Sequence, residues 1–187
     1  RIVIEDSAKI HMEEAQRARE EGYSKHDNPL PLYTLEDARA ATRLFRAVPR
    51  DAWQTGQEGL RFRFRYNGHI LGASFIELEI AGKRFVFSGD VGRPKDELLG
   101  PPERPERAEV LFLESTYGNR IHPDTDIESL LAEEIKGSIQ DRGACIIPSF
   151  AVERLQTVMF LLWKLLKTNR IPRLPIYVDS PMGENVL

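Results

Sequence analysis

The first sixty residues carry apolar positions at a helical spacing. We expect a first helix over residues 8–21, capped by Asp6 or Ser7, because small polar side chains can accept hydrogen bonds from the first free backbone N–H groups. A second helix is expected over 34–48, with Asp37 as a capping-box acceptor near its start. The pattern therefore predicts a helical beginning to the chain.

From residue 60 the apolar period changes to two, which is typical of a strand with one buried face. Segment 60–66 alternates apolar residues with three arginines, Arg61, Arg63 and Arg65. These three arginines are expected on one face of the strand. Two further strands are expected over 75–80 and 84–87, joined by a hairpin at 81–83.

A fully buried strand is expected over 110–113. After Tyr117 the pattern becomes that of an α/β protein, with a helix opened by Thr125 and ended by Gly143, a buried strand over 144–147, a helix over 151–167 and a last strand over 174–178. The only cysteine, Cys145, is expected to be a buried and unreactive thiol. The change near Tyr117 predicts a domain boundary, with domains over 1–117 and 118–187.

Composition narrows the class of protein only a little. The chain has 187 residues, of which 41% are apolar and 29% charged, as in ordinary globular domains. Its formal net charge of -3 neither favours nor excludes nucleic-acid binding, which depends on where the cations lie. No apolar run approaches the roughly 20 residues of a membrane span. Without a signal peptide, the cytoplasm is the expected location, with no membrane partner.

Three short stretches place polar side chains directly after predicted strands. They contain His69, Asp90 and Glu114. Imidazole and carboxylate groups together suit Zn²⁺, which accepts nitrogen and oxygen ligands. Each stretch also has a structural interpretation, since a lone histidine after a strand often makes only a hydrogen bond and Gly-Asp often forms a turn. Spacing alone leaves both interpretations open.

Five stretches, taken in order, resemble the β-CASP branch of the metallo-β-lactamase superfamily. They are GHILGA at 68–73, FSGDVGR at 87–93, LESTYG at 113–118, IPSFAV at 147–152 and VDSPM at 178–182. That branch includes the nuclease that cleaves pre-mRNA 3′ ends and prokaryotic RNases of similar build. The resemblance implies an α/β fold: a partial metallo-β-lactamase αββα sandwich followed by the start of an α/β β-CASP domain.

The resemblance also implies roles for individual residues. His69 matches a histidine that ligates one zinc ion, and Asp90 matches a catalytic carboxylate that bridges two. Glu114 matches a catalytic acidic residue thought to orient a later histidine; alternatively, it caps nearby backbone amides. The family's His-x-His-x-Asp-His motif and its two later histidines are absent from these 187 residues. We therefore expect two Zn²⁺ in the full-length parent and none stably bound by this chain.

Residues 147–154 suggest a second polar site. Ser149 comes between a predicted strand and a predicted helix, so its hydroxyl and the first helical N–H groups could bind a phosphate, with Arg154 adding charge. The alternative is a plain serine N-cap. Glu153 stands where the family usually has glycine, and a carboxylate there would repel phosphate.

The function implied by the resemblance is that of a zinc-dependent ribonuclease, with RNA as the partner. The row of Arg61, Arg63 and Arg65 is then either an RNA-facing stripe or a solvated sheet face. Both ends of the chain look cut, because it begins with Arg1 and stops without a helix end. We therefore expect a fragment that is inactive alone. One alternative is a non-catalytic β-CASP scaffold or RNA-binding subunit, and another is a lactamase-fold hydrolase of small molecules. Endonuclease or 5′-exonuclease action, and a monomer or a homo-oligomer, stay open.

Overall fold

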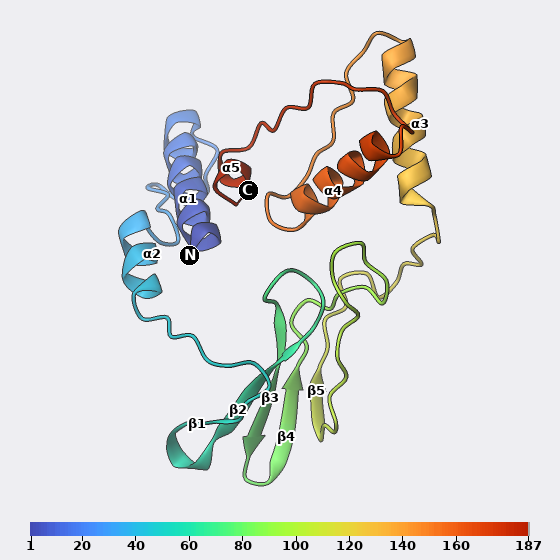
Figure 1. The fold of residues 1–187 in the computed structure, drawn as a ribbon. Helices are drawn as coiled ribbons and strands as arrows, with labels where there is room; N and C mark the ends of the chain where they lie inside the picture. The colour runs from blue at the N-terminus through green and yellow to red at the C-terminus, as the bar shows by residue number, and fades with distance from the viewer. Residues whose placement is uncertain (187) are drawn as a thin grey trace. The chain divides into compact units, whose positions relative to one another are not determined.

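The computed structural model describes residues 1–186, with side chains up to Glu184. By its internal contacts the chain divides into two compact units. Figure 1 labels their helices and strands. The first contains Arg1–Val48 and the segment that begins at Val178, and the second contains Pro49–Tyr177. The expected domain boundary near Tyr117 stays a prediction.

Helix α1 (Ile2–Glu21) begins earlier than the capping pattern predicts. The predicted caps Asp6 and Ser7 lie inside the helix, so this prediction is wrong. An ion pair of 2.7 Å between Arg1 and Glu5, spaced one turn apart, supports the extra turn. The helix ends at Gly22, whose left-handed backbone (φ 67°) lets its N–H donate to the carbonyl of Ala18.

Helix α2 (Leu35–Thr42) confirms the predicted capping box. The Thr34 hydroxyl accepts from the Asp37 backbone N–H, and the Asp37 carboxylate accepts from Thr34 N–H. The helix ends well before residue 48, however, and Leu44 and Phe45 are exposed. The same unit contains α5 (Pro181–Val186), which packs against α1.

The second unit is built on one mixed five-stranded sheet in the order β1-β2-β3-β4-β5. Its strands are β1 (Gln54–Thr55), β2 (Arg61–Tyr66), β3 (Ser74–Ile80), β4 (Lys83–Phe87) and β5 (Val110–Phe112). Neighbours from β1 to β4 are antiparallel, whereas β5 is parallel to β4. The predicted hairpin is confirmed, with Ala81 and Gly82 both at positive φ between Ile80 and Lys83.

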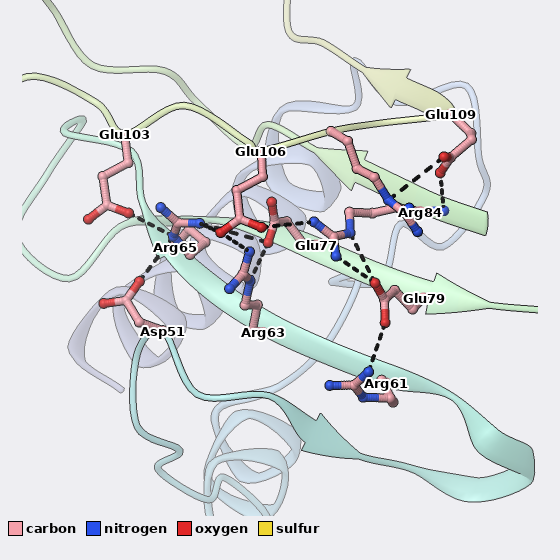
Figure 2. A network of polar contacts seen from close by, with 11 residues as sticks. Asp51, Arg61, Arg63, Arg65, Glu77, Glu79, Arg84, Glu103, Glu106 and Glu109 are labelled. Atoms are coloured by element: carbon pink, nitrogen blue, oxygen red, sulfur yellow. Dashed lines mark hydrogen bonds and ion pairs between the residues drawn. The ribbon is translucent and has the colours of Figure 1, made fainter. Parts of the chain in front are cut away.

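The arginine face of the sheet is covered by ion pairs (Figure 2). Arg63 is 9% exposed and bonds the Glu77 carboxylate, which is fully buried, across the β2–β3 pair. Arg65 pairs with Glu103 at 2.7 Å and with Asp51 at 3.1 Å. Neither a solvated face nor an RNA-facing stripe therefore describes Arg63 and Arg65, because acidic side chains already neutralise them.

Three strand predictions fail in part or whole. Segments 144–147 and 174–178 are not strands, and Ile146 and Tyr177 are each 86% exposed. Cys145 is exposed rather than buried, because the strand that would have enclosed it does not form. Strand β5 forms, but its residues are 36–52% exposed. It lies at the sheet edge and pairs only with β4.

Helices α3 (Ile127–Gln140) and α4 (Arg154–Lys167) pack on each other in the second unit. Their shared core contains Ala132, Ile135, Leu162, Leu165 and Ile171. Helix α3 is capped by Asp126 instead of Thr125, and α4 begins three residues later than predicted. The fold class is thus mixed α/β, as predicted. No helix of the described residues combines the length and the apolar character that crossing a membrane requires.

Candidate metal centre

The three predicted site residues follow strands that point the same way. Strand β3 is antiparallel to both β2 and β4, so β2 and β4 run in one direction, and β5 is parallel to β4. The carboxyl ends of these three strands therefore meet at one edge of the sheet. His69 follows β2, Asp90 follows β4, and Glu114 follows β5.

The structure brings His69 and Asp90 together. The distance from His69 Nε2 to Asp90 Oδ2 is 3.7 Å, and the two side chains are 44% and 74% exposed. Two ligand atoms at this separation can both lie within the roughly 2.0–2.2 Å that Zn²⁺ requires, so the pair fits one metal ion. Among the residues that the structure describes, no group of three or more His, Cys, Asp or Glu could hold a metal. Two ligands fall short of the three or four that a stable zinc site needs, so the metal-binding role of His69 and Asp90 stays a prediction.

Asn67 is a buried side chain that links the two loops. It is 2% exposed, and its Nδ2 donates to the carbonyl of Ser88 at 3.1 Å and to that of Asp90 at 2.8 Å. Its Oδ1 accepts from the backbone N–H of His69 at 3.3 Å. One carboxamide therefore sets the backbone of both predicted ligands.

Ser88 and Glu114 link the third loop to the second. The Ser88 hydroxyl accepts from the backbone N–H of Glu114 at 3.0 Å and donates to the carbonyl of Gly89. The Glu114 carboxylate accepts from Thr116 N–H at 2.9 Å and from Val91 N–H at 3.2 Å. The hydrogen bond from Thr116 N–H, followed by that from Val91 N–H, lowers the pKa of the Glu114 carboxyl below its usual value. Glu114 is thus an ionised side chain that holds the residue after Asp90.

These bonds match the structural alternative for Glu114, the capping of nearby amides. They do not use up its accepting capacity, because an ionised carboxylate has about four acceptor positions. The catalytic role predicted for Glu114 stays a prediction.

Close backbone approaches fix the His69 loop. A Cβ on Gly92 would lie 1.9 Å from the carbonyl oxygen of Gly68, so only glycine fits at position 92. Gly68 itself has φ 70°, and a Cβ there would come within 2.9 Å of the Gly100 carbonyl oxygen. The loop that contains His69 is thus packed between two other backbone segments, which restricts its position.

The second predicted polar site does not have its expected geometry. Helix α4 begins at Arg154, after Glu153 with φ 68°, so Ser149 is not its N-cap. The Ser149 hydroxyl is exposed and donates to the carbonyl of Ile147 at 3.4 Å. A phosphate-binding role for Ser149 and Arg154 stays a prediction, and the expected position of Ser149 at the start of the helix does not support it.

The sequence motifs identify the predicted metal ligands but not the buried residues that hold them by hydrogen bonds. Asn67 and Ser88 flank the predicted ligands and are both buried, although neither is a metal ligand. A signal for Asn67 did exist, because a polar residue between a strand and Gly68 must satisfy its donors in the fold.

A unit that combines helices with a mixed five-stranded sheet is consistent with a fragment of the metallo-β-lactamase fold. No family model matches the chain. A ribonuclease from Thermus thermophilus is 32% identical over 188 residues, covering 100% of this chain and 39% of that protein. An RNase J-like protein from Methanocaldococcus jannaschii is 33% identical over 67% of this chain and 31% of that protein. Cleavage and polyadenylation specificity factor 73 from Drosophila melanogaster is also 33% identical, over 69% of this chain and 19% of that protein.

The chain belongs to the β-CASP family of the metallo-β-lactamase superfamily. It spans well under half the length of these curated relatives. The predicted family is thereby confirmed. What the complete protein does is treated below as a proposal.

Proposed function

We propose that the protein containing this chain hydrolyses RNA phosphodiester bonds with two zinc ions, and that His69 and Asp90 are two of the metal ligands. The observation that carries this proposal is the 3.7 Å separation between His69 Nε2 and Asp90 Oδ2, in the loops that follow β2 and β4. The similarity to proteins named ribonuclease and endoribonuclease supports the choice of RNA.

The chemistry of the two side chains supports zinc in particular. A neutral imidazole is a good ligand for Zn²⁺ and a poor one for Mg²⁺, which prefers oxygen ligands. A carboxylate has two oxygens and can span two cations, whereas one imidazole nitrogen serves a single cation. Asp90 is therefore the proposed bridging ligand, and His69 the ligand of one ion.

The other residues of the site hold these ligands. Two divalent cations, when bound, would lower the pKa of a water molecule and stabilise the charge on the phosphodiester oxygens. Asn67 fixes the backbone of both ligands through one carboxamide. Glu114 holds the Val91 N–H beside Asp90, and its free acceptor positions could orient a histidine that is not among the 187 residues.

A non-catalytic RNA-binding subunit of the same family is the second candidate. Such a protein would bind RNA and leave it intact, with or without a metal.

Cleavage by the complete protein separates the two candidates. The assay follows an end-labelled RNA with zinc, and again with a chelator in excess. We expect chelator-sensitive cleavage, and a loss of at least about a hundredfold in kcat/KM for Asp90→Asn, which removes a charge from the metal site. The matched control is Asp27→Asn, an exposed carboxylate in the other unit. Intact RNA with the wild-type protein, or unchanged cleavage with Asp90→Asn, would contradict the proposal.

A further inference from the structure

A pocket of about 880 Å³ lies between α3 and the carboxyl end of α4. Its walls are the last turns of α4, the loop over 169–174, and Lys136 of α3. The walls are held by the α3–α4 core, in which Leu165 is fully buried. None of its residues belongs to the loops of the candidate metal centre.

The pocket is lined by cations without acidic neighbours in its walls. Its charged lining residues are Lys136, Lys167, Arg170 and Arg173. Arg170 is neutralised, because it donates to Glu128 at 2.7 Å and to Ser129 at 2.8 Å. Among the described residues, no carboxylate forms a salt bridge with Lys136, Lys167 or Arg173. The nearby Glu97 and Glu128 pair with Lys164 and Arg170 instead. Three uncompensated positive charges therefore surround the pocket.

An ordinary structural role explains only one of these cations. Lys167 lies in the last turn of α4, where a positive charge favours the helix dipole. Lys136 lies within α3 and Arg173 in a loop, so neither has this role. Stabilisation of a helix end therefore does not explain why Lys136 and Arg173 line the same pocket.

Trp163 adds an aromatic face to the same pocket. Its side chain is 52% exposed, whereas the adjacent Leu162 is buried in the α3–α4 core. The Lys167 ammonium lies 4.8 Å from the centre of the Trp163 ring, and Phe160 stacks on it at 5.7 Å. Lys167 and Phe160 thus hold the ring in place in a residue that is half exposed at the pocket.

We infer that this pocket is a binding site for single-stranded RNA, with phosphates on Lys136, Lys167 and Arg173 and a base stacked on Trp163. Proteins that bind single-stranded nucleic acid without sequence preference usually combine cations along the phosphate backbone with aromatic side chains on which bases stack. A base in a duplex is not free to stack on a side chain, so the ligand is unpaired. The inference rests on the proposed function for the choice of RNA, but it needs neither metal nor cleavage.

Binding of a labelled oligouridylate of about ten nucleotides to the chain tests this site. Fluorescence anisotropy is measured with a chelator present, so that no hydrolysis intervenes. The test variant is Lys167→Glu with Arg173→Glu. Its matched control is Lys83→Glu with Lys95→Glu, which makes the same charge change at exposed lysines of the same unit that line no part of the pocket. Circular dichroism confirms that each variant is folded.

We expect the pocket variant to bind at least about tenfold more weakly than wild type, and the control to stay within about twofold. Affinity of wild type should fall with salt at a logarithmic slope of about −2, for three phosphate contacts on a single strand, and the pocket variant should lose most of this slope. Trp163→Ala should weaken binding about tenfold with the slope unchanged, because stacking does not release counterions.

Equal weakening by the pocket and control variants, or unchanged binding with the pocket variant, would overturn the inference. A loss of cleavage in the complete protein with this binding intact would count against the proposed hydrolysis alone. Normal cleavage with no binding at this pocket would count against the inference alone. The two proposals therefore fail separately.

Discussion

Asn67 illustrates at the scale of single residues how one buried group supports the candidate site. Its carboxamide donates to the carbonyls of Ser88 and Asp90 and accepts from the His69 N–H. At 2% exposure, water cannot replace these partners. The position of both predicted ligands therefore depends on a residue that binds no metal itself.

Asn67→Ala should lower the free energy of unfolding by about 2 kcal/mol, because two carbonyls lose their donor. Asn67→Asp should cost at least as much near neutral pH, since a carboxylate of almost equal shape would face those same carbonyl oxygens. Urea unfolding followed by circular dichroism measures both. Wild-type stability for Asn67→Asp would show that the donor is unimportant.

Gly92 gives a second prediction at this scale. Gly92→Ala should destabilise the chain by about 3 kcal/mol or more, because the new Cβ would meet the Gly68 carbonyl oxygen at 1.9 Å and the backbone must move. The control is Gly137→Ala within α3, where a Cβ meets nothing within 4 Å. That change should stabilise the helix by about 0.5–1 kcal/mol. If thermal unfolding ranks the two variants in the opposite order, the close approach is wrong.

Motifs in the sequence were sufficient to predict His69, Asp90 and Glu114 as neighbours at strand ends. They could not predict the bonds that hold these residues, because Asn67 and Ser88 take their partners from distant segments. Such partners depend on strand register, which becomes visible only in the folded sheet.

At the scale of elements, ion pairs organise one face of the sheet from β2 to β4 and fix the segment before β5 to it (Figure 2). Arg84 pairs with Glu79 at 2.6 Å, and its backbone N–H donates to the Glu109 carboxylate. Glu106 lies within salt-bridge distance of Arg63 and Arg84. Ion pairs and a hydrogen bond thus hold the end of the linker between β4 and β5 to the sheet.

This network predicts a loss of stability in acid. Arg84 lowers the pKa of Glu79, Arg63 lowers that of Glu106, and the Arg84 backbone N–H lowers that of Glu109. A carboxyl whose pKa is lower in the folded state stabilises the fold above its unfolded pKa, about 4.3 for glutamate, and loses this contribution as the pH falls through the folded value. The free energy of unfolding should therefore be flat from about pH 7 to 5 and decline below that.

Glu79→Gln provides the control for the acid prediction, because it removes one titrating partner of Arg84. Its stability should decline less steeply with falling pH than that of wild type. Urea unfolding at a series of pH values tests this. Stability that stays constant down to pH 3, or an equal slope in the variant, would mean that the network does not stabilise the fold.

The sequence predicted the elements whose signals are local. The Thr34 capping box and the hairpin at Ala81-Gly82 depend on neighbouring residues and were confirmed. Segments 144–147 and 174–178 have the apolar composition of strands, but a strand needs a partner, and none pairs with them among the described residues. The arginine face was misjudged because its acidic partners, such as Glu103, lie far along the chain.

At the scale of the whole molecule, two compact units carry different features. The second unit holds both the candidate metal centre and the basic pocket. The chain spans 39% of its Thermus thermophilus relative, and its motifs predict His69 and Asp90 as metal ligands. The expectation that this chain alone holds no stoichiometric zinc and cleaves no RNA stays a prediction.

The central claim is that His69 and Asp90 ligate metal together. Metal content per chain, measured on the complete protein after dialysis, tests this most directly for wild type, His69→Ala, Asp90→Asn and the control His26→Ala, an exposed histidine outside the site. We expect two zinc ions in wild type and the control, and at least one ion lost in each site variant. Two ions retained by both His69→Ala and Asp90→Asn would contradict the account.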